Sequence, residues 1–153
     1  MSDALTRFGP CVQQWCPILL EDQILGNCDY RVTEPVDARD GPKTPVLWMA
    51  MWLVLRKPCE VGENMGTSEL YAAVKQVHAL MQSALELDLA VLQIGLIIAV
   101  YEMGHKLRQQ AFQTLAICTA TLTFLELEAG RKQDEDLLNV VGWLKASLAM
   151  IDR

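Results

Sequence analysis

The feature that most constrains the fold is an apolar run from Leu89 to Tyr101, interrupted only by one glutamine and one glycine. At about 13 residues the run is shorter than the roughly 20 that a helix needs to cross a bilayer. Asp88 is a typical helix cap and Gly104 a typical stop, so the pattern predicts one helix over Leu89–Met103. A helix that is apolar almost all round belongs at the centre of a bundle. We therefore expect other helices to enclose it.

Five further helices are expected around this central one. Most of them begin at a capping residue or a proline, repeat apolar residues at steps of three and four, and end near a glycine or proline. Gly130, Arg131 and Lys132 are expected to form the turn between the last two. The expected ranges are 18–25, 46–56, 67–86, 107–125 and 134–151. The sequence thus predicts an all-α fold, a compact bundle of about six helices that forms a single domain over residues 1–153.

Three of the expected helices are amphipathic, and their apolar stripes predict which side chains are buried. In the helix over 67–86, Lys75 lies opposite the stripe and is expected to face solvent. The stripes consist of Leu70, Val74, Val77, Met81, Ala84 and Leu85, of Leu107, Ala111, Leu115, Cys118, Leu122 and Leu125, and of Leu137, Val141, Leu144, Leu148 and Ile151.

The charge balance and the two ends of the sequence exclude several classes of protein. The net charge is −6, and the basic residues are scattered rather than gathered into a stripe, which predicts no direct binding of nucleic acid. Ser2, Asp3 and Ala4 do not resemble a signal peptide, and no segment is long enough to span a membrane. The five cysteines are odd in number and irregularly spaced. They predict reduced thiols in the cytoplasm or nucleus.

Few residues could carry catalytic chemistry. The two histidines are His78 and His105, and Glu102 with His105 forms one Glu-x-x-His spacing on a helix. Di-iron bundles use that spacing twice, together with further carboxylates, so we interpret Glu102 and His105 as a structural pair at a helix end. No metal and no cofactor are expected. The sequence has no nucleophile elbow, glycine-rich phosphate loop or paired-cysteine zinc spacing.

Aromatic residues on apolar helix faces offer one further hypothesis. They could line a pocket for an apolar small molecule, with polar side chains to orient it. Core packing is the alternative explanation, since aromatic residues on apolar faces are common core material. The predicted walls are Trp48, Trp52, Tyr101 and Trp143, and the candidate polar or catalytic groups are His105 and Glu102.

Several segments, taken in order, resemble the regulatory ("middle homology") domain of fungal binuclear zinc-cluster transcription factors. The opening Cys16–Leu19 is similar to that family's entry segment. The segment Ala99–His105 resembles its Tyr-Glu-x-Gly-His helix end, and Trp143 to Arg153 resembles its tryptophan-containing helix that ends in Leu-Asp-Arg. Further matching segments are Pro45–Met51, Arg56–Cys59, Ser68–Tyr71 and Val74–Lys75.

The sequence also departs from this family in two respects. The family's zinc cluster, with its paired cysteines and basic stretch, is absent, which implies a relative that does not bind DNA. The family's domain continues beyond the Leu-Asp-Arg helix, whereas this sequence ends at Arg153, so the resemblance covers about the first half of that domain. We expect that the helix surface that the second half of the family's domain would cover either forms a homodimer or is used in another contact.

The resemblance leads to three hypotheses. The first is a regulatory or ligand-binding module, tied to a secondary-metabolite pathway, that binds a transcription-factor partner or a small effector. The alternative is a small cofactor-independent cyclase, such as a Diels-Alderase-type pericyclase, on a repurposed regulatory fold. Pericyclic reactions need shape and pre-organisation more than a nucleophile, which suits a chain without a catalytic motif. The third is a truncated product with no independent role, which the agreement among caps and stripes disfavours.

Overall fold

The computed structural model of the chain describes residues 12, 18, 43–55, 68–84 and 89–151. Within these ranges the chain is helical and contains no strand, so the expected all-α class is confirmed there. The predicted helix over 18–25 lies outside the described residues, apart from Ile18. The five described helices are α3 (Lys43–Leu55), α4 (Glu69–Ala84), α5 (Leu89–Gly104), α6 (Arg108–Lys132) and α7 (Glu135–Ile151).

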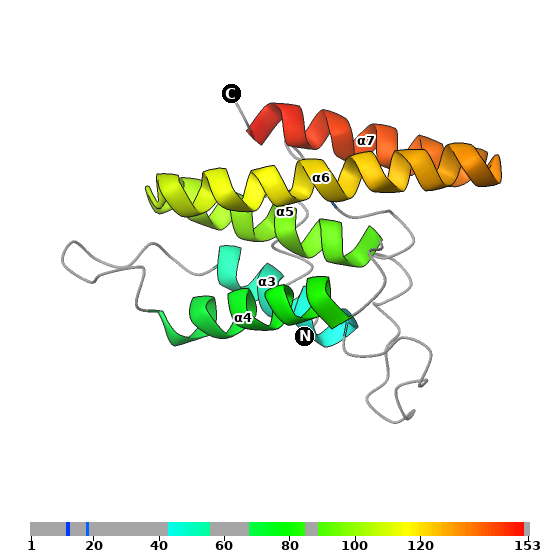
Figure 1. Ribbon diagram of the computed structural model, residues 1–153. Coiled ribbons are helices and arrows are strands. Elements are labelled where there is room, and N and C mark those ends of the chain that lie inside the picture. The colour runs from blue at the N-terminus through cyan, green and yellow to red at the C-terminus, as the bar shows by residue number, and fades with distance from the viewer. Residues whose placement is uncertain (1–11, 13–17, 19–42, 56–67, 85–88, 152–153) are drawn as a thin grey trace.

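Helix α5 lies at the centre of the bundle, as its apolar sequence predicts. Residues 91–99 are all buried, and Figure 1 shows α5 between α6 and α7 on one side and α3 and α4 on the other. Helix α5 packs against each of these four helices. The glutamine that interrupts its apolar run, Gln93, is fully buried and donates a hydrogen bond to the Ile18 carbonyl at 3.0 Å. That bond satisfies an amide that would be costly to bury alone.

Helices α6 and α7 form an antiparallel hairpin on one side of the molecule (Figure 1). The predicted turn at Gly130–Lys132 is wrong, because α6 continues to Lys132 and the chain reverses at Gln133, whose φ is 56°. The two amides after the helix donate to the Ala129 and Gly130 carbonyls and close its end. The two basic residues of the last turn also pair with an acid one turn earlier. These contacts offset the roughly 1 kcal/mol that a glycine costs inside a helix.

Side chains cap the starts of α4 and α7. The Ser68 hydroxyl accepts from the Tyr71 amide at 3.5 Å, and the Asp134 carboxylate accepts from the Leu137 amide at 2.9 Å. Each bond satisfies an amide that the helix leaves without a partner at its start. The starts of α4 and α7 therefore follow from local sequence.

The predicted apolar stripes of α4, α6 and α7 are confirmed, because every member whose side chain is described is buried or half-buried. The side chains of Ala84 and Leu85 lie outside that set. The predicted position of Lys75 is corrected, because its side chain is only 34% exposed and reaches a buried carboxylate. Among the helices of the described ranges, none is both long and apolar enough to cross a membrane.

Candidate functional site

A buried carboxylate lies where α4, α5 and α6 meet. Glu102 is fully buried, and its oxygens receive three donors. The hydroxyls of Tyr71 and Thr114 each donate at 2.6 Å, and the Lys75 ammonium forms an ion pair with it. Lys75 also donates to the Thr114 hydroxyl at 2.7 Å. These four residues, the Glu102 cluster, provide the hydrogen bonds and opposite charge that a buried carboxylate requires.

A row of stacked rings lies beside the Glu102 cluster. The ring centroids of Tyr71 and Tyr101 are 5.3 Å apart, and those of Tyr101 and His105 are 3.9 Å apart. The Nδ1 atom of His105 lies 2.7 Å from the Tyr101 carbonyl and must carry a proton, because a carbonyl can only accept. Glu102 and His105 thus make separate contacts, and their predicted pairing is wrong. Burial, followed by the hydrogen bond to Glu102, raises the pKa of Tyr71, so its hydroxyl remains a donor.

Two further reactive side chains are packed against Gly95. A Cβ atom at this glycine would lie 2.7 Å from the Cys118 sulfur and 3.1 Å from the His78 ring. Burial raises the pKa of the Cys118 thiol to about 12 and lowers the pKa of His78. The His78 Nε2 atom lies 3.0 Å from the Val91 carbonyl, to which it donates. A protonated thiol in this setting is a small apolar core residue and a poor nucleophile.

The four aromatic residues predicted as pocket walls lie in different environments. Trp48 on α3 and Tyr101 on α5 are buried, whereas Trp52 on α3 is 45% exposed and Trp143 on α7 is 66% exposed. Helix α3 packs against α4 and α5, while α7 packs against α6 and α5. Trp143 therefore belongs to a different layer of the bundle from the other two tryptophans.

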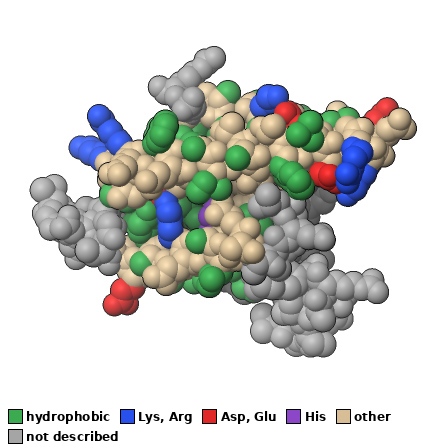
Figure 2. Space-filling model, viewed as in Figure 1, with side chains coloured by type: hydrophobic (Ala, Val, Ile, Leu, Met, Phe, Trp, Pro, Cys, Tyr) green, Lys and Arg blue, Asp and Glu red, His purple; other side chains and the backbone are tan. Residues whose placement is uncertain are grey.

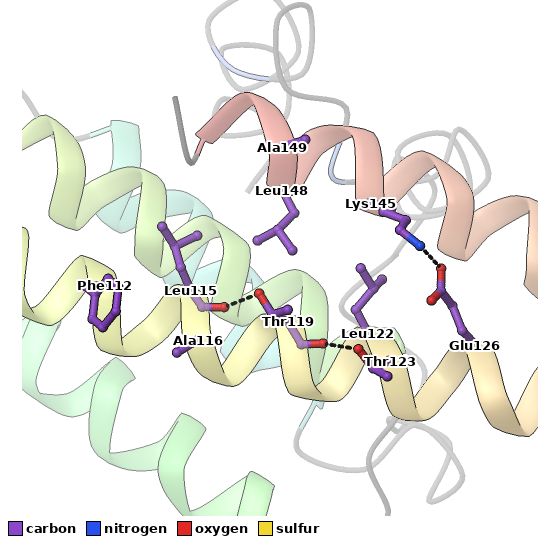
Figure 3. A pocket seen from close by; sticks show the side chains of 10 residues that line it. All are labelled: Phe112, Leu115, Ala116, Thr119, Leu122, Thr123, Glu126, Lys145, Leu148 and Ala149. Carbon is purple, nitrogen blue, oxygen red and sulfur yellow. Dashed lines mark hydrogen bonds and ion pairs between the residues drawn. The ribbon is translucent and has the colours of Figure 1, made fainter.

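A groove of about 440 Å³ runs between α6 and α7 (Figure 3). Figure 3 shows Phe112 at one end and the ion pair between Lys145 and Glu126, with a separation of 2.7 Å, at the other. The hydroxyls of Thr119 and Thr123 donate to carbonyls one turn earlier in α6. Its remaining lining is apolar and consists of Leu115, Ala116, Leu122, Leu148 and Ala149. None of the four predicted aromatic walls lines this groove.

The outer surface of α6 and α7 exposes many large apolar side chains. Helix α6 carries no charged residue between Arg108 and Glu126, and α7 carries one, Lys145, after its first turn. Figure 2 shows hydrophobic side chains spread along both helices on the viewed face, with most of their charged side chains toward the ends. We call the exposed apolar set the α6–α7 face. It consists of Phe112, Ile117, Phe124, Leu127, Leu138, Trp143 and Met150.

Exposed apolar side chains in such number on two adjacent helices are typical of a surface that binds a partner. The sequence pattern did not predict this face, because the repeat of apolar residues identifies the buried stripes of the same helices and not their solvent side. The sequence feature that indicates this face is the absence of charged residues from 17 consecutive positions, 109–125, of a helix that has one side exposed to solvent. Nor did the pattern predict that Tyr71, Lys75 and Thr114 surround Glu102. The spacing of polar residues within one helix does not show which residues of other helices they contact.

Comparison with known proteins gives no assignment, because no family model matches the chain and neither a curated protein nor a solved structure matches it. Within the described part of the chain, no three His, Cys, Asp or Glu side chains are grouped to hold a metal ion. The resemblance to fungal zinc-cluster regulatory domains therefore stays a prediction.

Proposed function

We propose that this chain is a regulatory module that does not bind DNA and that acts through protein contacts made by the α6–α7 face. The observation that carries the proposal is the set of exposed apolar side chains on these two helices, along stretches where Lys145 is the one charged residue between Arg108 and Glu126 of α6 and after the first turn of α7. Three of its members, Phe112, Leu127 and Trp143, are 74%, 70% and 66% exposed. Aromatic and aliphatic side chains of this kind form the centres of protein interfaces.

The net charge of −6 supports a protein partner over a nucleic acid, because phosphates are repelled by an acidic surface. The resemblance to transcription-factor regulatory domains suggests a partner in transcription, and a biosynthetic pathway as the regulated process.

The Glu102 cluster supports this proposal over the cyclase alternative. A general acid or an orienting group must present a free donor or acceptor to its substrate. The Glu102 carboxylate is fully buried and is engaged by three side chains of its own bundle. Its contacts are those of a residue that fixes helix positions.

The proposal is tested by deleting the gene and reading transcripts and metabolites from the same cultures. Loss of a group of transcripts together with all metabolites of one pathway is the expected result. Steady transcripts with accumulation of one uncyclised intermediate would instead assign the chain to catalysis and overturn the proposal.

A complementation series then connects the activity to the proposed surface. Strains that carry Phe112→Glu or Trp143→Glu are expected to behave like the deletion, while the proteins keep the helical content of the wild type. Leu80→Glu is the matched control, because Leu80 is 64% exposed on α4, away from the α6–α7 face. Full activity of both face variants would exclude this surface from the function.

A further inference from the structure

We propose that the α6–α7 face binds a second copy of this chain, with the two α6 helices antiparallel across a two-fold axis near Ala120. This inference rests on the proposed function, since it names a partner for the same face. Three properties of the face favour a second copy of this chain as its partner: the order of its apolar residues, the charges at its ends, and its size.

The exposed apolar residues of α6 are placed symmetrically about Ala120. Ile117 and Phe124 lie three and four residues to either side of it and share one flank of the helix. Phe112 and Leu127 lie eight and seven residues to either side. In a two-fold pairing each residue meets the one at the opposite position, so Ile117 of one copy contacts Phe124 of the other. The same pairing brings Phe112 to Leu127.

The two ends of the hairpin carry opposite charge. At the start of α6, Lys106 and Arg108 are exposed and give a charge of +2. At the other end four acids and two bases give −2, and two of those acids, Glu135 and Asp136, are exposed in the first turn of α7. An antiparallel pair places the basic end of each copy beside the acidic end of the other. A parallel pair would bring like charges together and would be disfavoured.

Helix α7 leaves room for this arrangement because it covers only part of α6. The ion pair between Lys145 and Glu126 places α7 along the second half of α6, and Figure 1 shows the first part of α6 extending beyond it. Ile117 and Phe124 lie about half a turn around α6 from Glu126, so α7 also leaves their side of the helix uncovered.

The size of the face is sufficient for a stable dimer. Helix α6 has 25 residues. At about 1.5 Å per residue it is about 37 Å long, and two packed helices present a surface about 20 Å wide. Because α7 has 17 residues and covers only part of that length, the face offers up to about 600 Å² per copy, at the lower end of the range for stable interfaces.

The test is sedimentation of the purified full chain over a range of concentrations, with circular dichroism to confirm that each variant is folded. Wild type is expected to sediment as a dimer at micromolar concentration. Ile117→Glu with Phe124→Glu is expected to sediment as a folded monomer, and the Leu80→Glu control as a dimer. A wild type that stays monomeric at the highest concentration would overturn the proposal.

Charge exchange tests the antiparallel orientation. Lys106→Glu with Arg108→Glu makes both ends acidic, and Glu135→Lys with Asp136→Lys makes both ends basic. Each chain alone is expected to dimerise at least about tenfold more weakly, and an equimolar mixture of the two is expected to form a heterodimer. A mixture that stays monomeric, or single chains that dimerise as well as wild type, would overturn the antiparallel arrangement.

The outcomes separate this inference from the proposed function. If the chain is a monomer but the Phe112→Glu and Trp143→Glu strains lose regulation, the face binds a different protein and only the dimer is excluded. If the chain is a dimer through this face but deletion leaves all transcripts unchanged, the dimer stands and the regulatory function is excluded.

Discussion

The Glu102 carboxylate holds three helices in one arrangement. It joins α5 to α4 through Tyr71 and Lys75, and to α6 through Thr114. Apolar packing alone tolerates small sliding movements of helices, whereas hydrogen bonds of 2.6 Å to a single carboxylate permit only one relative position. A buried network of this kind specifies the register of the bundle.

Replacing Glu102 with Gln is expected to lower the free energy of unfolding by about 3 kcal/mol, because the neutral amide removes the negative charge opposite Lys75 and replaces one of the two accepting oxygens with a donor. Urea denaturation followed by circular dichroism measures the change. The matched control is Glu126→Gln, which breaks the exposed ion pair with Lys145 and is expected to cost less than about 1 kcal/mol. Equal effects of the two variants would refute the structural role of the cluster.

His78 makes the stability of the bundle depend on pH. Burial lowers its pKa below the ordinary 6.5, with a smaller lowering by Lys75 and opposing contributions from the Val91 carbonyl and Glu102. The unfolded chain therefore binds a proton at this site at a pH where the folded chain does not. Stability is fully present above pH 6.5 and is lost as the pH falls from 6.5 through the lowered pKa of the folded state.

Wild type is thus expected to lose stability on acidification below pH 6.5, with a contribution from this group of up to about 1.4 kcal/mol per pH unit. His78→Gln removes the titrating ring and should reduce that slope. Denaturation midpoints measured at several pH values for both proteins provide the check. Identical slopes in this window would show that His78 is not protonated differently in the two states.

At the scale of elements, α4 and α6 both pack closely against α5 at Gly95, through His78 and Cys118. A Cβ atom there would lie 2.7 Å from the Cys118 sulfur, closer than such atoms pack in proteins. The glycine thus allows α5 to contact both neighbouring helices without a side chain between them. The apolar sequence of α5 indicated its burial, but the need for a glycine at this position depends on residues 17 and 23 positions away along the chain.

Gly95→Ala is expected to destabilise the protein by about 1 to 3 kcal/mol through overpacking, as urea denaturation would measure. Gly142→Ala is its control, because that glycine lies in α7 with open space around it, and alanine there should raise stability by up to about 1 kcal/mol. Adding Cys118→Ala to Gly95→Ala should recover part of the loss. A tolerated alanine at Gly95 would contradict the close approach.

Helix positions were largely predictable from sequence because caps and stripes are local patterns. The start of α7 near residue 134 and its buried side followed from a few neighbouring residues. The end of α6 did not, since Gly130 is a typical stop but the left-handed residue is Gln133. Local pairing of charged residues outweighed the glycine there. The same limit applies to Lys106 after α5, which adopts a φ of 62° where a glycine is usual.

For the whole molecule, the sequence predicts the buried side chains well and the exposed apolar side chains poorly. Trp143 was expected to line a pocket, yet it lies on the α6–α7 face and is 66% exposed. An apolar residue at an outward position has the same local pattern as one that packs against a neighbour. Only the placement of α7 on α6 decides between the two. The sequence does not predict the Glu102 cluster for a similar reason, since its members come from three helices.

The enclosure of α5 by four helices has a consequence for hydrogen exchange. Amide protons at its centre, such as those of Ile94 to Ile98, can reach solvent only when the entire bundle opens. Their exchange rates are expected to yield the same free energy as denaturant unfolding, while amides of α7, with one exposed side, exchange through smaller openings. Mass spectrometry of peptides from both helices provides the measurement, and equal protection in α5 and α7 would contradict it. The exchange rate of each central amide of α5 is therefore expected to measure the global stability of the protein.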